Sequence, residues 1–397
     1  MPHYTYLIVG GGMTADAAIG GIRDFDPNGS IGLVGDESHP PYDRPPLSKG
    51  LWKGKPLESI WRKSDFHGVT FHLGRKVRLL DPPNKRVTDD EGTAYTFDKL
   101  LLATGGTPRR LSFGGDDIIY YRTVDDYERL RTITDESEQF AVVGGGFIGS
   151  EIAAALTLNG KKVVMAFPGF GIGSHLFPVD LAGFLNDYYR QKGVDVLTGE
   201  RVMGWEMRQD KHVLKTHNAQ TQADREIVVD AVVAGIGIQP NVELAEAAGL
   251  DVDNGIRVDR GLLTSHPDIY AAGDVANFHN PAMDQRLRVE HEDNANTMGA
   301  LAGHAMAGEA VSYDHLPSFY SDLFDLGFEA VGEVDFRLET VSDWKQPYRE
   351  GVVYYLRDGR VRGVLLWNVW DQIDAARQLI GETGPFTAAD LKGRLPA

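Results

Sequence analysis

The sequence predicts an α/β protein with two Rossmann-like nucleotide-binding domains and a C-terminal α+β domain. Two glycine-rich turns carry this prediction, because each follows a short apolar strand and opens a helix. They read Gly-x-Gly-x-x-Ala at residues 10–15 and Gly-x-Gly-x-x-Gly at residues 144–149. The third observation is a change to strand and hairpin patterns from Ser312 onward. We expect a discontinuous first domain, a second nucleotide domain and the C-terminal domain at residues 1–112 with 240–311, 113–239, and 312–397.

The first turn joins an apolar strand to an expected helix at Met13–Phe25. Its glycines, Gly10 and Gly12, let the backbone approach a pyrophosphate and direct the N–H groups of the helix start toward it. A second strand at residues 31–34 ends beside Asp36, about 20 residues downstream, where a carboxylate accepts hydrogen bonds from ribose hydroxyls. The alternatives are a glycine turn without a ligand and, for Asp36, a solvated turn acid.

Composition excludes several classes of function. Forty Lys and Arg against 57 Asp and Glu give a net charge of −17, so we expect neither nucleic acid nor a membrane as partner. Residues 1–5 lack the basic start and apolar core of an export signal, and we expect the cytoplasm. The chain has no cysteine, which excludes disulfides, thiolate-bound metals and redox dithiols. Electron chemistry therefore needs a bound cofactor, and we expect no metal.

The segment at residues 39–50 is a stiff loop, because four prolines exclude a helix interior and a central strand. Its Arg44 is suited to clamp a pyrophosphate or to stack on adenine, since a guanidinium does both. Its Lys49 is suited to place a positive charge near a reacting ring. The alternative is a surface loop whose cations are solvated.

A series of strands completes the first domain's first segment. We expect short strands at residues 69–77 and 87–97 and a further apolar strand at residues 99–103. The turn at residues 104–110, with its small residues and basic pair, indicates the crossover out of this domain.

The second glycine turn follows a strand at residues 140–143 and opens a helix that ends at Asn159 and Gly160. Two such fingerprints in one chain imply two dinucleotide sites. The partner strand at residues 161–167 is followed by Gly169 rather than by a carboxylate for the ribose, and no arginine follows closely for a 2′-phosphate. NADH and NADPH therefore both stay open, with NADH slightly favoured.

Strands at residues 202–207, 213–215 and 227–233 complete the second domain. In its exit turn, Gly237 leaves room for a nicotinamide against bare backbone. A strand within residues 262–272 then leads to an expected helix at Asp274.

Two polar stretches that follow, at Asp274 and at Glu290 and His291, each have a functional interpretation and a purely structural one. Asp274 is suited to accept hydrogen bonds from sugar or polyol hydroxyls, or else caps a helix. The next helix starts near Glu290 and His291 and runs to about Met306. The residues at its start line a cleft or, alternatively, stabilise the helix dipole.

The C-terminal domain shows strands at residues 328–334, 351–357 and 361–367, the last two joined by a two-residue hairpin turn. An amphipathic helix at residues 371–380 and a capping box at residues 387–390 follow. Just before this domain's strands, Phe319 and Tyr320 either cover a cofactor ring or belong to the core.

Several motifs resemble the FAD-dependent pyridine-nucleotide reductases of the ferredoxin-reductase type. They are the glycines at 10–12, Pro-Tyr-x-Arg-Pro-Pro-Leu-Ser-Lys at 41–49, Ala-Thr-Gly-Gly-Thr-Pro-Arg at 103–109 and the second fingerprint. Within this family, four segments are most similar to the apoptosis-inducing factors: Leu-Phe-Pro at 176–178, Pro-Asn-Val-Glu-Leu at 240–244, Val-Glu-His at 289–291 and Val-Leu-Leu-Trp-Asn at 364–368. The similarity runs from about Tyr4 to Ile380.

The resemblance implies FAD in the first nucleotide domain and NAD(P)H in the second. The implied FAD-binding residues are Gly10, Gly12, Met13, Thr14, Ala15, Asp36, Arg44, Lys49, Val77, Ala103, Thr104, Gly105, Arg109, Asp274, Glu290, His291 and Tyr320. The implied NAD(P)-binding residues are Gly144, Gly146, Phe147, Ile148, Gly149, Glu151, Gly237 and Glu290.

Lys49 and Glu151 are the implied catalytic residues. In the family, the lysine lies near flavin N5 and the glutamate pairs with it, which would orient the ammonium and tune how readily the ring accepts hydride. The alternative for Glu151 is stabilisation of a helix N-terminus. Two departures from the family are Gly169, which replaces an acid on the NAD ribose, and Tyr320, which replaces a tryptophan.

The implied activity is that of an FAD-dependent NAD(P)H reductase, which takes hydride from NAD(P)H onto FAD and passes electrons to an external acceptor. A ferredoxin or rubredoxin, a quinone and another small molecule such as monodehydroascorbate are the candidate acceptors. The charge of −17 disfavours an acidic protein partner unless basic residues gather locally. The alternative is a redox-sensing interaction protein, in which a long-lived reduced FAD–NAD complex controls dimerisation. A homodimer stays open.

Overall fold

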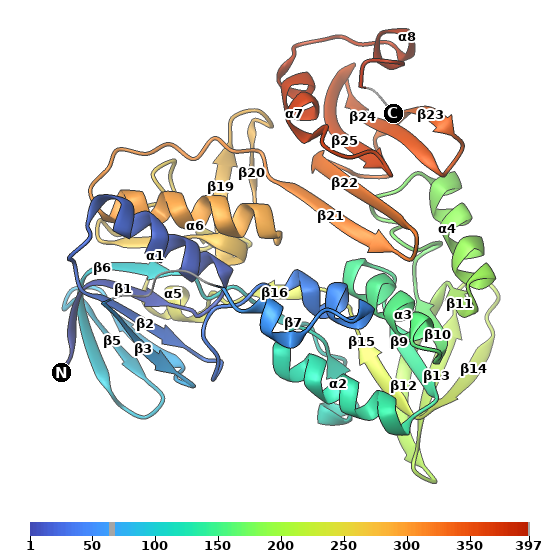
Figure 1. Cartoon of the computed structure of the whole chain (residues 1–397), viewed down its shortest axis with the longest axis horizontal. Coiled ribbons are helices and arrows are strands. Elements are labelled where there is room, and N and C mark those ends of the chain that lie inside the picture. The colour runs from blue at the N-terminus through green and yellow to red at the C-terminus, as the bar shows by residue number, and fades with distance from the viewer. Residues whose placement is uncertain (63–67, 396–397) are drawn as a thin grey trace. The chain divides into compact units, whose positions relative to one another are not determined.

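The computed structural model describes residues 1–62 and 68–395, coloured along the chain in Figure 1. Backbone contacts divide the chain into two compact units. Unit 1 comprises Met1–Arg44, Leu57–Thr107 and Gln239–Ser318, and unit 2 comprises Pro45–Pro56, Pro108–Ile238 and Phe319–Ala397. The division into three functional domains stays a prediction.

Unit 1 is built on a seven-stranded sheet. Its order is β3-β2-β1-β6-β5-β4, and β18 pairs with the other side of β6. The strands are β1 (His3–Val9), β2 (Ile31–Gly35), β3 (Val69–Leu73), β4 (Val77–Asp81), β5 (Arg86–Asp89), β6 (Ala94–Leu102) and β18 (Ile269–Ala271). β1 is parallel to both neighbours, with Leu7 opposite Gly32 and Leu100. Strand β1 is therefore central, as its unbroken apolar run requires.

Helices α1 (Met13–Phe25) and α6 (Glu292–Met306) lie side by side in unit 1 (Figure 1). Small residues permit this close approach. A Cβ added at Gly303 would lie 2.3 Å from the carbonyl oxygen of Ala18, and one added at Gly21 would lie 2.1 Å from that of Ala300. The pair fixes α1, whose first residues belong to the first glycine turn.

Smaller elements complete unit 1 and its connections to unit 2. A three-stranded sheet has the order β17-β19-β20, and β7 pairs with β16. Their bounds, with helix α5, are β7 (Gly106–Pro108), β16 (Ile238–Pro240), α5 (Glu243–Ala247), β17 (Ile256–Arg257), β19 (Ala276–Asn280) and β20 (Gln285–Leu287).

Unit 2 contains a second parallel sheet, of order β11-β10-β9-β15-β8. An antiparallel sheet of order β12-β13-β14 accompanies it. The strands are β8 (Ile118–Tyr120), β9 (Gln139–Val143), β10 (Lys162–Phe167), β11 (Val194–Thr198), β12 (Glu200–Arg208), β13 (Lys211–Asn218), β14 (Asp224–Val229) and β15 (Ala231–Ala234). The helices are α2 (Val124–Glu136), α3 (Phe147–Leu158) and α4 (Val179–Gln191).

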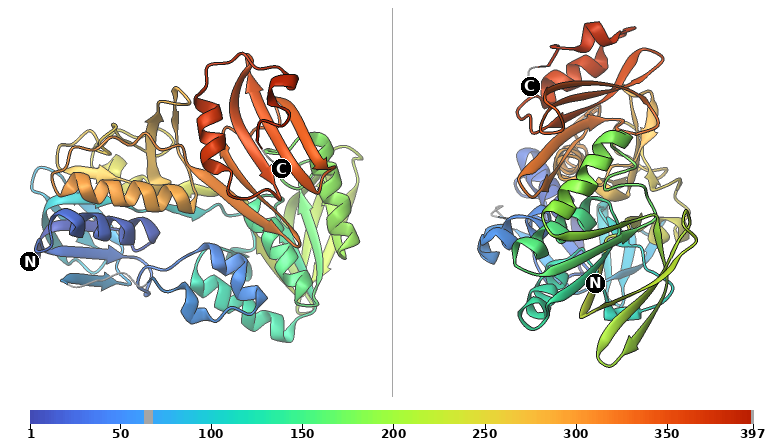
Figure 2. Two further views of the ribbon diagram at one scale, coloured as in Figure 1. Left: turned by 45° about the horizontal axis from the view of Figure 1, so that its top comes forward. Right: turned by 90° about the vertical axis from the view of Figure 1, so that its right-hand side faces the viewer.

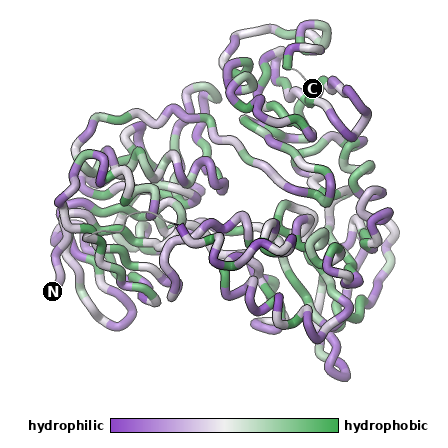
Figure 3. The backbone as a smooth tube through the Cα atoms, viewed as in Figure 1, coloured by the Kyte–Doolittle hydropathy of each residue, from purple (hydrophilic) through white to green (hydrophobic). Residues whose placement is uncertain are grey.

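The C-terminal module of unit 2 is a five-stranded sheet of order β21-β22-β25-β24-β23. Helix α7 packs on β22 and β25, as the left view of Figure 2 shows. The elements are β21 (Ser318–Leu323), β22 (Leu326–Gly332), β23 (Glu339–Gln346), β24 (Glu350–Arg357), β25 (Arg360–Trp367), α7 (Ile373–Gly381) and α8 (Ala388–Leu391). Figure 3 shows hydrophobic residues along the strands and hydrophilic residues along the connecting loops.

The sequence-based prediction of an α/β fold with a sheet-rich C-terminal part is confirmed, and several details are as expected. Helix α1 has the expected bounds, and α3 ends at Leu158 with Asn159 as its C-cap. The hairpin turn at Asp358 and Gly359 has φ values of 52° and 71°, as a type I′ turn requires. The capping box of Thr387 and Asp390 is present.

Four expectations about elements were wrong. Residues 227–233 form two strands, β14 and β15, because Asp230 accepts backbone N–H bonds at the point where the chain changes sheets. The strand expected at residues 99–103 is the second half of β6 (Ala94–Leu102), which continues without a break from residues expected in the preceding strand. The helix expected at Asp274 is one 3-10 turn followed by β19. The strand expected at residues 69–77 is broken at Gly74, whose φ is +64°.

No described helix is long and apolar enough to cross a bilayer. Within residues 1–62 and 68–395, no group of three or more His, Asp or Glu side chains is arranged to hold a metal ion.

Candidate functional site

The two glycine turns are built alike. Gly10 ends β1 with φ +123°, and an added Cβ would lie 2.1 Å from the carbonyl oxygen of Ala103. Gly144 ends β9 with φ +117°, and an added Cβ would lie 2.3 Å from the carbonyl oxygen of Gly235. In both turns the neighbouring chain is backbone that follows the adjacent parallel strand. Only glycine satisfies both the dihedral angle and the space.

Both turns open a helix whose N-cap is glycine. Gly12 precedes α1 and Gly146 precedes α3, each with extended backbone. A glycine cap has no side chain to bond the first N–H groups, so these donors and the positive end of the helix dipole are directed to a ligand. The third small residue, Ala15 or Gly149, is fully buried or lies against the turn itself. The two cradles therefore fit the pyrophosphates of two dinucleotides.

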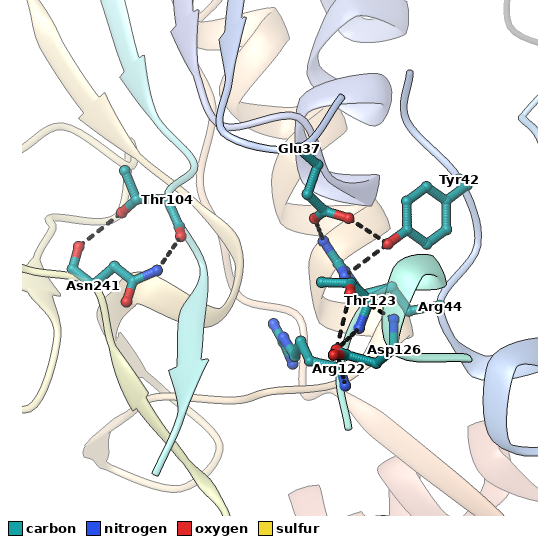
Figure 4. Close-up of polar contacts among 8 residues, drawn as sticks. All are labelled: Glu37, Tyr42, Arg44, Thr104, Arg122, Thr123, Asp126 and Asn241. Carbon is teal, nitrogen blue, oxygen red and sulfur yellow. Dashed lines mark hydrogen bonds and ion pairs between the residues drawn. The ribbon is translucent and has the colours of Figure 1, made fainter. Parts of the chain in front are cut away.

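Arg44 lies beside the first cradle. Its Nη2 is 4.0 Å from the position of a Cβ added at Gly12. The guanidinium forms an ion pair with Glu37 and donates to the Tyr42 hydroxyl at 3.1 Å (Figure 4). Burial opposes the charge of Arg44, but the carboxylate of Glu37 outweighs it and raises the pKa of the guanidinium. Arg44 thus stays a cation at the edge of the turn.

Asp36 and Glu37 follow β2 but face different partners. Asp36 is largely exposed and pairs with Lys76 at 3.1 Å. Glu37 holds Arg44 and accepts from Tyr42. Sequence reasoning considered Asp36 and missed Glu37, because both acids follow the same strand and only the fold separates their directions.

The crossover after β6 is held by Asn241, which sequence reasoning also missed. Its amide donates to the carbonyl oxygen of Thr104 at 2.8 Å, and the Thr104 hydroxyl donates to its backbone oxygen at 2.8 Å (Figure 4). Gly105 has φ +64°. These bonds keep Ala103 pressed against the first glycine turn. Arg122, Thr123 and Asp126 in the same view belong to the capping box of α2.

The remaining predicted residues of unit 1 lie on four parts of the chain: the 3-10 turn after β18, the residues just before α6, helix α1 and strand β4. An added Cβ at Gly273 would be 2.3 Å from the Thr14 hydroxyl oxygen, so Asp274 follows directly beside the start of α1. Arg288 donates to the Asp274 carbonyl oxygen at 3.1 Å and pairs with Glu290 at 2.7 Å. His291 is the N-cap of α6. The other two are on helix α1 and strand β4: Met13 and Val77, both buried.

Lys49 and Glu151 meet within unit 2. Lys49 Nζ is 2.8 Å from each carboxylate oxygen of Glu151. The Glu151 side chain is buried, at 2 % exposure, and the Lys49 side chain is partly buried, at 14 %. Burial of an ion pair is tolerated only where further hydrogen bonds complete it. Glu151 is one helical turn into α3, directly after the second fingerprint.

The loop that carries Lys49 is held in place by contacts at Leu47 and Trp52. The carbonyl oxygen of Leu47 accepts from Trp52 Nε1 at 2.8 Å and from the Tyr121 hydroxyl at 2.5 Å. Arg131 lies over the Trp52 ring, 4.8 Å from its centroid. The aromatic and cationic contacts fix the backbone at Ser48 and Lys49.

Tyr320 covers the ammonium of Lys49, whose Nζ is 5.1 Å from the ring centroid. The tyrosine side chain is 39 % exposed, so the interpretation of Tyr320 as a core residue was wrong. Phe319 packs edge-to-face on Phe147 and Phe328, at 5.7 and 6.2 Å. Phe147 is the first residue of α3, so this aromatic group borders the second cradle.

The second cradle has two neighbours that sequence reasoning missed. His175 Cε1 is 4.0 Å from a Cβ added at Gly146, and its ring is edge-on to Phe147. Burial lowers the pKa of His175, although Asp335 raises it. A Cβ added at Gly169 would lie 2.4 Å from the Ser174 hydroxyl oxygen. Both residues are in a turn that sequence patterns leave undefined.

A small pocket beside this cradle is lined by described residues of unit 2. They come from the start of α3, from the turn after β10, and from β21 and β22: Gly146, Phe147, Ser150, Ile172, Gly173, His175, Leu176, Phe177, Ser321, Leu323 and Phe328. The lining of this small pocket is mainly apolar.

The exit turn of unit 2 brings two predicted residues together. Arg109 donates its backbone N–H to the carbonyl oxygen of Gly237 at 2.9 Å. Gly237 has φ +88°, and an added Cβ would lie 3.9 Å from the Arg109 side chain. Ile148 packs against Gly235, the residue that closes the second cradle.

Comparison with known proteins gives matches along nearly the whole chain. The family model described as pyridine nucleotide-disulphide oxidoreductase matches residues 4–299. The model described as the C-terminal part of mitochondrion-associated apoptosis-inducing factor matches residues 302–347 and 342–382.

Individual relatives agree with these models. The chain is 33 % identical to apoptosis-inducing factor 1 of Dictyostelium discoideum, over 95 % of this chain and 78 % of that protein. It is 35 % identical to the ferredoxin reductase subunit of 5,5′-dehydrodivanillate O-demethylase of Sphingobium, over 91 % and 89 %. Putidaredoxin reductase, solved as a covalent complex with putidaredoxin, has a TM-score of 0.88 at 30 % identity, over 96 % of this chain and 94 % of that one.

Proposed function

The chain belongs to the pyridine nucleotide-disulphide oxidoreductase family, and from this premise we propose that it passes electrons from NADH through FAD to a small iron–sulfur protein of the ferredoxin type. The pair of matching glycine cradles carries this proposal, because it provides for two dinucleotides in one chain. As a member of the family, the protein is an FAD-dependent NAD(P)H oxidoreductase.

The family's disulphide chemistry has no place in this chain, which contains no cysteine. FAD, when bound, supplies a ring that accepts hydride from a nicotinamide and gives up electrons singly. The electrons therefore leave for an external acceptor, without a protein thiol as relay.

The chain's own residues bind, orient and supply charge. The turns at Gly10 and Gly144 offer backbone N–H donors to the two pyrophosphates. Arg44 adds a cation to the first. We assign Lys49 the task of holding a positive charge beside the flavin ring, with Glu151 fixing its position. Such a fixed charge favours the reduced, more negative ring.

The choice of acceptor rests on the ferredoxin reductases among the relatives and on the Pro-Pro-Leu-Ser-Lys segment at residues 45–49. The relatives include the demethylase ferredoxin reductase subunit, at 35 % identity, and putidaredoxin reductase, at a TM-score of 0.88. Ferredoxin-type partners are usually acidic, and the charge of −17 repels them at long range. We therefore expect moderate salt to raise the rate of encounter.

NADH is the proposed donor. A 2′-phosphate needs a nearby fixed cation, and residues 167–174 contain neither Lys nor Arg. Gly169 offers no side chain there, and the hydroxyl of Ser174 occupies the adjacent space. A neutral environment of this kind accepts the ribose hydroxyls of NADH without repelling them.

The test is rapid mixing of the FAD-loaded protein, first with NADH or NADPH without oxygen, then with candidate acceptors. We expect fast reduction by NADH and fast reoxidation by a [2Fe–2S] ferredoxin. Fast reoxidation of the flavin by a quinone, with slow reoxidation by ferredoxin, would show that the acceptor is a quinone rather than a ferredoxin. Failure of both nicotinamides to reduce the flavin would contradict the whole proposal.

A second candidate function has one observation in its favour, the match of residues 302–382 to the C-terminal part of apoptosis-inducing factor. Under this hypothesis the protein is a redox sensor, and a lasting complex of reduced FAD with NAD controls dimerisation. Slow reoxidation by every acceptor, with an NADH-dependent increase in sedimentation coefficient, would favour it. A cytoplasmic location stays a prediction under both hypotheses.

A further inference from the structure

Two serines complete the hydrogen bonding of Glu151. Ser48 donates to Oε2 at 2.5 Å, and Ser321 donates to Oε1 at 2.6 Å. Lys49 Nζ is 2.8 Å from both oxygens. Each carboxylate oxygen therefore accepts one hydroxyl and shares the ammonium. All of these donors and the carboxylate lie within unit 2.

This arrangement fixes the orientation of the Glu151 carboxylate. Ser48, Glu151 and Ser321 are 5 %, 3 % and 1 % exposed, so water does not substitute for a missing donor. A carboxylate with both oxygens occupied cannot rotate without breaking a short, charge-assisted hydrogen bond. Its plane in turn fixes the ammonium of Lys49 midway between the oxygens. The position of the charge on Lys49 is thus set by the serines.

The negative charge of Glu151 also affects a nearby tyrosine, Tyr189. Tyr189 donates its hydroxyl to the backbone oxygen of Ser150 at 3.1 Å. Burial and then the charge of Glu151 raise the pKa of Tyr189 well above its ordinary value, so the phenol stays neutral. A neutral phenol and two hydroxyls therefore surround the ion pair, and Glu151 has Lys49 as its cationic partner among the described contacts.

Strand β21 supplies two consecutive residues to this pair. Tyr320 lies over the ammonium of Lys49, and Ser321 bonds the carboxylate of Glu151. Ser48 comes from the proline-stiffened loop, and Glu151 comes from helix α3. The C-terminal module thus takes part in placing the charge, although the glycine cradles lie outside it.

We propose that Ser321 and Ser48 are positioning residues for hydride transfer, which hold the Glu151 carboxylate so that Lys49 presents its ammonium to the flavin. The inference rests on the proposed function, in which Lys49 lies beside the ring. Removing the Ser321 hydroxyl leaves Oε1 with the ammonium alone, so the ammonium shifts from its midway position toward Oε1. A displaced charge stabilises the reduced ring less.

The test compares Ser321→Ala with the wild type in FAD-loaded protein. We expect reduction by NADH to slow about tenfold, since small misplacements of a reacting group have effects of at least this size. The midpoint potential of bound FAD, measured by dithionite titration without nicotinamide, should become more negative. Ser321→Thr keeps the hydroxyl and should restore both values. Ser342→Ala, on strand β23 of the same sheet, is the matched control and should change neither.

A double-mutant cycle separates positioning from general damage. In a Glu151→Gln background, Ser321→Ala should have almost no further effect on rate or potential, because its route of action is gone. Equal effects of Ser321→Ala in both backgrounds would overturn the inference, as would an unchanged potential. If Ser321→Ala unfolds, Ser48→Ala provides the same comparison from the other oxygen. Failure of wild-type reduction would instead contradict the proposed function, and this inference with it.

Discussion

Alanine substitutions at Gly10 and Gly12 should separate the two tasks of the first cradle. An alanine Cβ at position 10 would lie 2.1 Å from the carbonyl oxygen of Ala103 and 2.6 Å from its carbon. Both atoms are backbone, so the end of β6 has to move. The left-handed φ of +123° adds about 1–2 kcal/mol, and overpacking adds about 1–3 kcal/mol. Gly10→Ala should therefore destabilise the protein by about 2–5 kcal/mol.

Gly12→Ala should behave differently. The residue has φ −93°, and the added Cβ meets only Arg44 Nη2, at 4.0 Å. Its effect on stability should stay below about 1 kcal/mol, the difference between glycine and alanine at an N-cap. The new methyl group stands where the pyrophosphate approaches, so FAD affinity should fall at least tenfold, which is about 1.4 kcal/mol.

The assay combines urea unfolding of the apoprotein with FAD titration followed by flavin fluorescence. The apoprotein is used because bound FAD itself stabilises the native state. Normal FAD affinity in Gly12→Ala would refute the placement of the pyrophosphate. Normal stability in Gly10→Ala would refute the packing of β6 on the turn. Gly144→Ala should likewise lower the stability of the protein, and Gly146→Ala should lower its affinity for NADH.

Three further predictions concern packing, cofactor choice and pH. Gly303→Ala should lower stability by about 1–3 kcal/mol, because its Cβ would lie 2.3 Å from the Ala18 carbonyl oxygen; urea unfolding with an unchanged midpoint would contradict this. Ser174→Arg should raise kcat/KM for NADPH relative to NADH without the clash expected from an arginine at Gly169, and an unchanged ratio would show that the ribose lies elsewhere. Burial lowers the pKa of His175, so its contribution to stability is complete above pH 6.5 and is lost as pH falls through the folded-state pKa. In His175→Gln, the melting temperature should fall less steeply than in wild type as the pH is lowered below 6.5. A pH profile of the melting temperature identical to that of wild type would refute this prediction.

Sequence patterns determined the elements whose signals are local. Helix α1 has a glycine turn before it and a continuous series of small and apolar residues, so both ends were predictable. Helix α2 was missed although Thr123 and Asp126 form a capping box. Strand β21 was missed because its residues alternate imperfectly between Ser, Asp and aromatic side chains. Polar residues in a strand are informative only once their partners are known.

The site shows the same limit. Gly10 and Gly144 were predictable, since the fingerprint itself demands glycine at the turn. Ser321 was not, because its partner Glu151 is 170 positions away and no spacing rule links them. The contact of Glu37 with Arg44 was not predictable for a similar reason, because the direction of a side chain after a strand depends on the loop that follows. Long-range hydrogen bonds are a property of the fold.

The central claim is that one chain holds FAD and accepts hydride from a nicotinamide without any thiol. Anaerobic titration of the FAD-reconstituted protein with NADH, followed by visible absorption, tests it most directly. We predict that the flavin band is lost in proportion to added NADH and is fully bleached at one equivalent per chain. A protein that retains no flavin after reconstitution, or a flavin band unchanged by both NADH and NADPH, would contradict the claim.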